Sequence, residues 1–171
     1  MRRTIGLSIA GALLMIAGFV GPVEAAGVQR STTGDGRQLT GAGVGFRTFA
    51  FAVVEHNDGR VTGEASVMNP VIGSDRVFEI SCLTVIIGND GSPIAIASGP
   101  VVAAEDPSLI GRNGIFAVQD LGEGHDPSDR MTLGVLLSPV RCADVTSEEA
   151  LRSVFPRGLL AIDDGNIQVR A

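Results

Sequence analysis

The residues best suited to chemistry are four carboxylates within one ten-residue stretch, Asp120, Glu123, Asp126 and Asp129. Their hard oxygen atoms are the ligands that Ca²⁺ prefers in proteins. The spacing differs from that of an EF-hand loop, in which acidic ligands alternate and a glutamate closes the loop. A solvated loop whose aspartates cap turns is the commoner arrangement with this composition. The stretch therefore predicts either a weak calcium site or an ordinary acidic loop.

Catalytic arrangements have less support. Glu64 and Glu79 are the candidates for glycoside hydrolysis, which needs two carboxylates facing each other across a cleft, but both suit the exposed face of a strand equally well. Neither His56 nor His125 lies in a triad pattern, and no G-x-S-x-G elbow occurs. The chain has no Lys, Trp or Tyr, which excludes a Walker-type phosphate loop and removes the usual stacking platforms for sugars and bases. We expect a protein that is not an enzyme, with no catalytic residues and no cofactor apart from the calcium alternative.

The first 25 residues have the organisation of a secretory signal peptide. Arg2 and Arg3 precede an apolar stretch over residues 5–20, and a small-x-small cleavage site precedes Ala26. We expect residues 1–25 to be removed rather than kept as a membrane anchor, so that the mature protein is secreted. Loss of two of the 13 basic residues and one of the 19 acidic residues changes the formal charge from −6 to −7. This charge argues against nucleic acids and anionic membranes as partners.

Cys82 and Cys142 are the only cysteines. In an exported protein a disulfide between them is the default expectation, and it would close a loop worth roughly 4 kcal/mol in the chain-entropy model. Two free, buried thiols that behave as small hydrophobic side chains are the alternative. The spacing of these cysteines, in a chain with only two histidines, does not match a zinc site.

The chain is organised around Arg76–Gly91, which contains the longest β-like run. Its density of apolar and β-branched residues is typical of a strand that is buried on both faces or lies in the middle of a sheet. The alternation changes phase near Ser81–Leu83, which predicts either a bulge or a strand that crosses between two packed sheets. A hairpin turn at Asn89-Asp90-Gly91 then leads into a return strand over residues 93–102.

Alternation and turn residues predict the remaining elements. Further strands are expected at residues 46–54, 61–68, 114–120, 131–137, 159–162 and 166–170, the last two joined as a closing hairpin by Asp163-Asp164-Gly165. One helix is expected over 146–155, opened by a capping box of Thr146 and Glu149. The Gly-, Ser- and Thr-rich segment 26–36 is predicted to be a flexible arm, followed by a single domain at 37–171 with a short strand near 37–40. This pattern indicates an all-β fold, an antiparallel β-sandwich or small barrel with one short helix.

Several short motifs occur in a characteristic order between Arg37 and Arg170. They are Phe49-Ala-Phe51, Gly63-Glu64, the run Ile80–Asn89, the run Phe116–Gly124 and the run Gly165–Val169. As an ordered set they resemble the small secreted β-rich domains of bacterial exported proteins labelled post-COAP-1. The resemblance implies a secreted β domain of no established activity and transfers no catalytic residues. Asp164 stands where those domains usually have glycine, so the closing turn is expected to differ.

These observations together predict a monomeric, secreted, non-enzymatic module with a binding or structural role and an unspecified partner. One alternative is a small barrel that carries an apolar ligand among Phe49, Phe51, Phe116 and Leu133, although the same four residues would serve as an ordinary core. A weak calcium-dependent binding module is the other alternative.

Overall fold

The clearest alternation in the sequence folds as predicted, into the hairpin of β2 (Phe46–His56) and β3 (Val61–Met68). In β2, inward residues are buried and outward residues are exposed along most of the strand. The connecting turn is closed by hydrogen bonds from the Gly59 amide to the His56 carbonyl (2.8 Å) and from the His56 amide to the Arg60 carbonyl (2.9 Å). Gly59 has a φ of +79°, a conformation that favours glycine.

The structure, a computed structural model, describes residues 27–39, 45–70, 73–122, 128–132 and 136–171. Within these residues the fold is mostly antiparallel β, with a single short α-helix, which confirms the predicted all-β class. The other elements are β1 (Val28–Leu39), β4 (Arg76–Glu79), β5 (Cys82–Ile87), β6 (Pro93–Ala104), η1 (Pro107–Leu109), β7 (Asn113–Gln119), β8 (Arg130–Thr132), β9 (Leu136–Leu137), η2 (Cys142–Asp144), α1 (Glu148–Val154), β10 (Leu159–Ala161) and β11 (Asp164–Arg170). Hydrogen-bonded neighbours run in the order β10-β8-β7-β6-β4-β3-β2-β1-β11, and β5 and β9 pair with β6 and β7.

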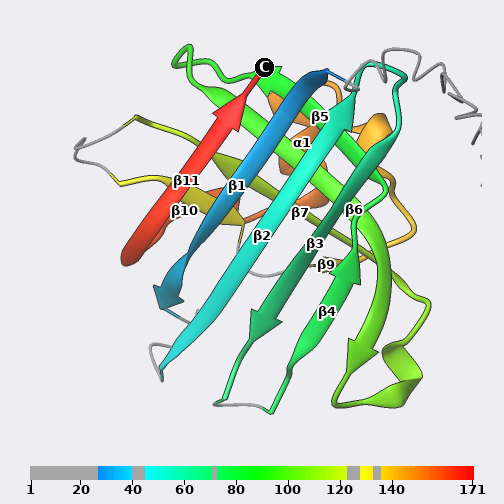
Figure 1. Cartoon of the computed structure of the whole chain (residues 1–171). Helices are drawn as coiled ribbons and strands as arrows, with labels where there is room; N and C mark the ends of the chain where they lie inside the picture. Colours follow the sequence, from blue (N-terminus) through cyan, green and yellow to red (C-terminus); the bar gives the residue numbers. More distant parts are fainter. Residues whose placement is uncertain (1–26, 40–44, 71–72, 123–127, 133–135) are drawn as a thin grey trace, which may run out of the picture.

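This sheet curls into a half-barrel whose two halves face each other (Figure 1). We call β11, β1, β2, β3 and β4 the open layer, and β5, β6, β7, β8 and β10 the covered layer. The sheet turns from one layer into the other along β6, which pairs with β5 and β7 through its first half and with β4 through its second. Apolar side chains from both layers, including Phe51, Phe78 and Phe116, form the main core between them.

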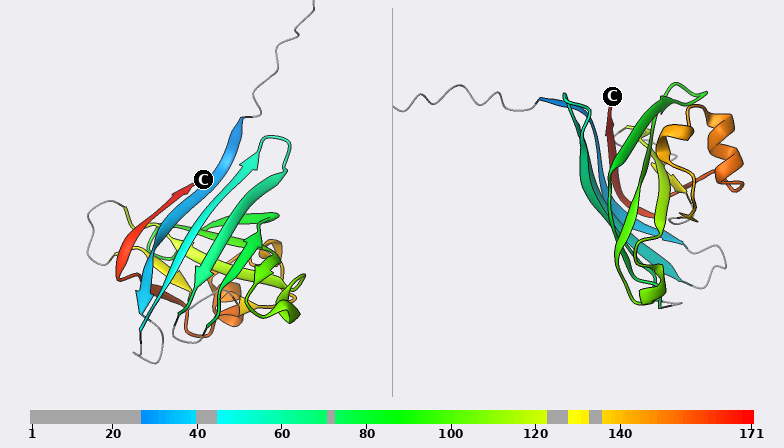
Figure 2. Two further views of the ribbon diagram at one scale, coloured as in Figure 1. Left: turned by 60° about the horizontal axis from the view of Figure 1, so that its bottom comes forward. Right: turned by 90° about the vertical axis from the view of Figure 1, so that its right-hand side faces the viewer.

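The outer side of the covered layer is packed as well. Ile94 and Ile96 of β6 contact a second apolar cluster with Leu151 and Phe155 at the α1 segment. Figure 2 shows α1 (orange) on the side of this layer that faces away from β1–β3. The N-cap of the helix lies one residue later than predicted, because Ser147 rather than Thr146 accepts the Ala150 amide (3.1 Å).

The predicted central strand forms two strands, β4 inside the sheet and β5 at an edge. β4 ends at Glu79 in the open layer and β5 begins at Cys82 in the covered layer, so of the two alternatives that the phase change left open, a bulge or a crossing, the structure has the crossing. For β4 the expected place in the middle of the sheet is confirmed, since β4 lies between β3 and β6. For β5 the expectation was wrong, since among the described residues β5 pairs with β6 alone and Ile87 is 62% exposed. The strands buried on both faces are β6 and β7. Apolar density does not reveal how many neighbours a strand has, and β6 fills its central place largely with small residues.

The segment predicted to be a flexible arm forms most of β1, which lies between β2 and β11. Gly34 and Gly36 face inward, opposite Phe51 and Phe49 of β2. A Cβ atom on Gly34 would lie 2.7 Å from Cζ of Phe51, so the phenyl ring fills the space that a side chain at position 34 would need. Aromatic rings that cover strand glycines in this way stabilise a strand with little apolar content of its own.

The predicted closing hairpin does not form. β10 pairs with β8 and β11 pairs with β1, so the chain passes from the covered layer to the open layer between them. Asp163 holds this crossing, because its amide donates to the Arg37 carbonyl (2.9 Å) and its carboxylate accepts the Leu39 amide. The strand predicted over 131–137 is represented by β8 and β9, and residues 133–135 lie outside the described residues.

Candidate functional site

Two members of the predicted acidic site, Asp120 and Asp129, are bound to backbone amides. Asp129 accepts the amides of Leu121 (2.9 Å) and Ile167 (2.7 Å). Asp120 accepts the amides of Gly122 (2.8 Å) and Val169 (2.9 Å). All four carboxylate oxygens of this pair therefore receive an N–H group.

Two of those amides belong to β11, which ends the sheet. Strand β11 pairs with β1 on one side, and the carboxylates of Asp120 and Asp129 receive N–H groups of β11 that this pairing does not use. We call these two residues the carboxylate seam, because they tie the last strand to the segment between β7 and β8. Glu123 and Asp126 lie outside the described residues, and the described part contains no group of three or more His, Cys, Asp or Glu placed to hold a metal. A calcium site in this stretch stays a prediction.

The catalytic candidates are brought together only in part. Glu64 of β3 is the direct cross-strand partner of Glu79 of β4, and both side chains are exposed. Two like charges opposite each other on a sheet repel, which disfavours the pair in the absence of a cation or a proton. His56 Nε2 lies 2.9 Å from the Thr62 hydroxyl, and its Nδ1 is buried without a partner within the described residues. Since no third group orients that histidine there, the arrangement lacks the geometry of a triad.

The four residues predicted to line an apolar ligand cavity belong to the core where the structure describes them. The rings of Phe49 and Phe51 have centroids 6.1 Å apart, and those of Phe51 and Phe116 are 5.4 Å apart. All three rings are buried in the main core. Leu133 lies outside the described residues. These contacts are those of a packed interior.

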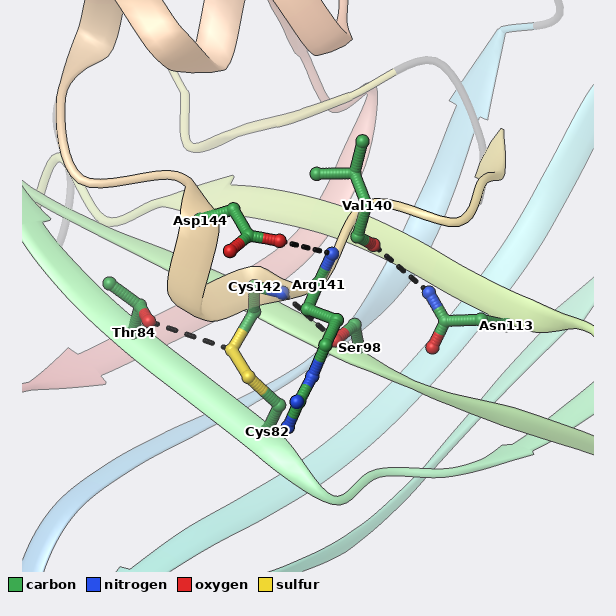
Figure 3. The surroundings of a disulfide bond; sticks show 8 residues. All are labelled: Cys82, Thr84, Ser98, Asn113, Val140, Arg141, Cys142 and Asp144. Atoms are coloured by element: carbon green, nitrogen blue, oxygen red, sulfur yellow. Dashed lines mark hydrogen bonds between the residues drawn. A yellow bond between two sulfur atoms is a disulfide. The ribbon is translucent and has the colours of Figure 1, made fainter.

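The predicted disulfide joins Cys82 of β5 to Cys142 of η2, with Cα atoms 5.9 Å apart (Figure 3). The Cys142 amide donates to the hydroxyl of Ser98 on β6 (3.1 Å), and the Thr84 hydroxyl lies 3.5 Å from the Cys142 sulfur. The disulfide therefore attaches the η2–α1 segment to β5, the edge strand of the covered layer on which this segment packs.

A buried polar cluster links the open layer to β8 and β10. Arg47 lies on the inward face of β2 and is 6% exposed. Its Nη2 donates to the side-chain oxygen of Gln38 and to the Thr132 carbonyl (2.9 Å), while Gln38 Nε2 donates to the carbonyls of Met131 (3.2 Å) and Leu160 (3.1 Å). Burial lowers the pKa of Arg47 to about 10. This cluster was not predicted from the sequence, although Arg47 at an inward position of the β2 alternation was a visible signal.

Two open depressions on the outer side of the open layer were not predicted from the sequence either. Their volumes are about 560 and 530 Å³, and both are lined by Asp35, Ala50 and Ser66, so they form one continuous hollow that we call the outer-face groove. Figure 1 shows the strands that form it, β11, β1, β2 and β3, side by side. The remaining lining residues are Thr33, Gly34, Gly36, Arg37, Thr48, Phe49, Phe51, Ala52, Glu64, Met68, Asp164, Gly165, Asn166 and Gln168.

The outer-face groove has a small-residue floor and an acidic rim. Ala50 and Ala52 leave the floor low, so that a bound group can approach the backbone closely. Asp35, Glu64 and Asp164 supply three carboxylates, and Arg37 is the one cation among the lining residues. The Arg37 guanidinium lies 3.6 Å from the carboxylate of Asp164. The unbalanced charge of the groove is therefore negative.

Comparison of the chain with protein-family models, curated proteins and solved structures finds no match. The fold and its sites define the class by themselves, an all-β protein with one curled sheet, an internal disulfide and an acidic groove on its open layer. Among the described residues no helix is long and apolar enough to cross a membrane.

Proposed function

We propose that this protein is an exported, non-enzymatic binding module whose outer-face groove takes an extended, positively charged segment of a polypeptide. The observation that carries the proposal is the acidic groove on a sheet face that nothing else in the described chain covers. Carboxylates only accept hydrogen bonds, so they select a ligand rich in donors such as ammonium, guanidinium and amide groups. Complementary charge also speeds the encounter with a basic partner.

The dimensions of the groove suit such a segment. Four neighbouring strands span about 14 Å at the usual spacing between strands, which is the length of four to five extended residues. Asn166 and Gln168 of β11 add amide groups that both donate and accept, as recognition of a peptide backbone requires. The absence of Trp and Tyr counts against a sugar as the occupant.

The disulfide supports an exported location, because disulfides persist in oxidising compartments and are rare in the cytosol. The signal-like leader and the resemblance to small secreted β domains agree with this location. A protein outside the cell that presents an acidic groove on a disulfide-stabilised scaffold is suited to binding a basic partner.

The test is a fluorescence-anisotropy titration of the mature protein with a labelled pentapeptide of alternating arginine and glycine. We expect binding that weakens with salt, and about tenfold weaker binding by the double variant Asp35→Asn, Glu64→Gln at low salt. Glu149→Gln is the control for the loss of a surface carboxylate, since Glu149 is exposed on α1, away from the groove. No binding by the wild type, or equal binding by the groove variant, would contradict the proposal. Tighter binding of a neutral oligosaccharide of similar length would replace the peptide by a sugar.

A further inference from the structure

A second hollow lies on the outer side of the covered layer, beside α1. It has a volume of about 450 Å³, within the range of small-molecule sites. We call it the helix-side cleft. It is lined by Asn89, Asp90, Ile94, Gln119, Arg130, Glu148, Leu151, Arg152, Pro156, Arg157, Gly158 and Leu159. Figure 2 shows α1 on the side of the molecule opposite β1–β3, so this cleft is separate from the outer-face groove.

The two carboxylates of the cleft are already engaged. Glu148 accepts the Asn89 amide (2.9 Å) and the guanidinium of Arg152 (2.7 Å). Asp90 accepts hydrogen bonds from the amide and the hydroxyl of Ser92 and from the side-chain amide of Gln119. The hydrogen bonds from Ser92 hold the pKa of Asp90 below its usual range, and the Asn89 amide lowers the pKa of Glu148. Both acids are therefore ionised at neutral pH and bound to groups of the protein itself.

The cations of the cleft outnumber these acids. Arg130, Arg152 and Arg157 line it, and only Arg152 has a carboxylate partner within the described residues. Arg130 is half-buried at the start of β8, where it is held in register by Gln119 of β7 and Ala161 of β10. Arg157 lies in the turn after α1 and is exposed. Arg130 and Arg157 therefore line the cleft with N–H donors that no carboxylate of the described residues pairs with.

The lining of the cleft is mostly polar and includes a smaller apolar part. Ile94 of β6 and Leu151 of α1 are each 1% exposed, and Leu159 of β10 packs against the same cluster. Of these three residues only Leu159 is partly exposed, so a ligand in the cleft would place a small apolar group against Leu159 and a charged group beside the arginines. The cleft thus combines two recognition elements that differ in chemistry and lie within one hollow.

We propose that the helix-side cleft binds a small oxyanion, a carboxylate, phosphate or sulfate, carried on an apolar group, with Arg130 and Arg157 as its ligands. A guanidinium presents two parallel N–H groups that match the two oxygens of such an anion, and a bound anion restores charge balance in the cleft. This site does not depend on the outer-face groove, which selects the opposite charge.

Isothermal titration of the mature protein with benzoate, inorganic phosphate and sulfate tests the proposal, with benzamide as the uncharged analogue of benzoate. We expect benzoate to bind, benzamide to bind at least tenfold more weakly, and Arg130→Gln and Arg157→Gln each to weaken benzoate binding about tenfold. Phosphate or sulfate binding more tightly than benzoate, with the same dependence on the two arginines, would assign the site to a tetrahedral anion. Arg130→Lys keeps the positive charge but loses the two parallel N–H groups of the guanidinium, so this variant should bind benzoate with intermediate affinity.

Two controls separate this site from general effects. Arg60→Gln removes an exposed cation from the β2–β3 turn, where Arg60 pairs with Asp58 (3.9 Å), and should leave benzoate binding unchanged. The groove variant Asp35→Asn, Glu64→Gln should also bind benzoate normally, so failure of one site does not imply failure of the other. Because Arg157 lies in an exposed turn, the Arg157→Gln variant should fold normally. Its melting temperature checks this. Absence of anion binding by the wild type, or wild-type affinity in both arginine variants, would overturn the proposal.

Discussion

The open layer and the covered layer bury their apolar residues in different ways. Strands of the open layer alternate between a core face and an exposed face, as β2 and β3 show. Strands β6 and β7 of the covered layer are buried on both faces, between the main core and the α1 segment. The outer face of the open layer is exposed and can receive a partner. The outer face of the covered layer is buried by the η2–α1 segment, so its burial depends on the disulfide that attaches this segment. This contrast between the layers can be tested by substitutions at four places. They are the disulfide, the carboxylate seam, the glycines of β1 and Arg47.

Removing the disulfide should have the largest effect and should act on the covered layer. Cys82→Ser, Cys142→Ser releases a cross-link between residues 60 apart, and the chain-entropy model gives a loss of about 4 kcal/mol in the free energy of unfolding. Hydrogen exchange should rise first at η2, α1 and β5, while the β2–β3 hairpin keeps its protection. Urea unfolding and hydrogen-exchange mass spectrometry measure both quantities. Uniform loss of protection in both layers would mean that the layers are not separable in this way.

Asp129→Asn should have the next largest effect, because Asp129 joins the two layers at β11. Asp129 is 7% exposed and accepts two backbone amides, and an amide side chain cannot accept both through its two ends. We expect the free energy of unfolding to fall by about 3 kcal/mol, as when a buried, charge-assisted hydrogen-bond acceptor is lost. Denaturant unfolding measures the change.

A chelator provides the control for this role of Asp129. If the carboxylates serve the backbone alone, EDTA leaves the melting temperature of the wild type unchanged. A fall in melting temperature with EDTA that Ca²⁺ reverses would restore the calcium site predicted for the acidic stretch.

Gly34→Ala tests the inward face of the open layer. The new methyl group would lie 2.7 Å from Cζ of Phe51 and 2.9 Å from the Asn166 carbonyl oxygen, so the ring and a neighbouring strand must both move. We expect a loss of about 2 kcal/mol, typical of overpacking in a core. Thr33→Ala changes the adjacent, outward residue and should alter the free energy of unfolding by less than about 0.5 kcal/mol. Similar losses in the two variants would mean that β1 is not divided into an inward and an outward face.

Local patterns predicted the strands well and their neighbours poorly. The alternation of β2 and β3 and the phase change at Ser81–Leu83 were visible because one face of each segment is apolar. The place of β1 was hidden, since the apolar contacts of Gly34 come from Phe51 on another strand. The separation of β10 from β11 was hidden for a similar reason, because a turn-forming sequence also suits a crossing between layers.

The candidate sites were predictable to a similar extent. Cys82 and Cys142 were paired correctly from the cysteine count and the signal-like leader. The roles of Asp120 and Asp129 depend on amides of β11 that are 49 and 38 residues away, which no local pattern contains. The same limit applies to the groove and the cleft, whose residues come together only when distant strands pair.

Arg47 offers the smallest of these effects and the most specific one. Burial lowers the pKa of the Arg47 guanidinium in the folded protein to about 10, well below its ordinary value in an unfolded chain. Above pH 10 the folded protein loses this proton more readily than the unfolded chain, so the buried charge is neutralised and the free energy of unfolding should rise with pH. The chain has no Lys or Tyr and both cysteines form the disulfide, so few other groups titrate between pH 9 and 11. Denaturant unfolding across this range should show a rise in the free energy of unfolding with pH in the wild type and not in Arg47→Met. The same pH dependence in both proteins would mean that Arg47 keeps its proton because its hydrogen bonds with Gln38 and Thr132 stabilise the charge.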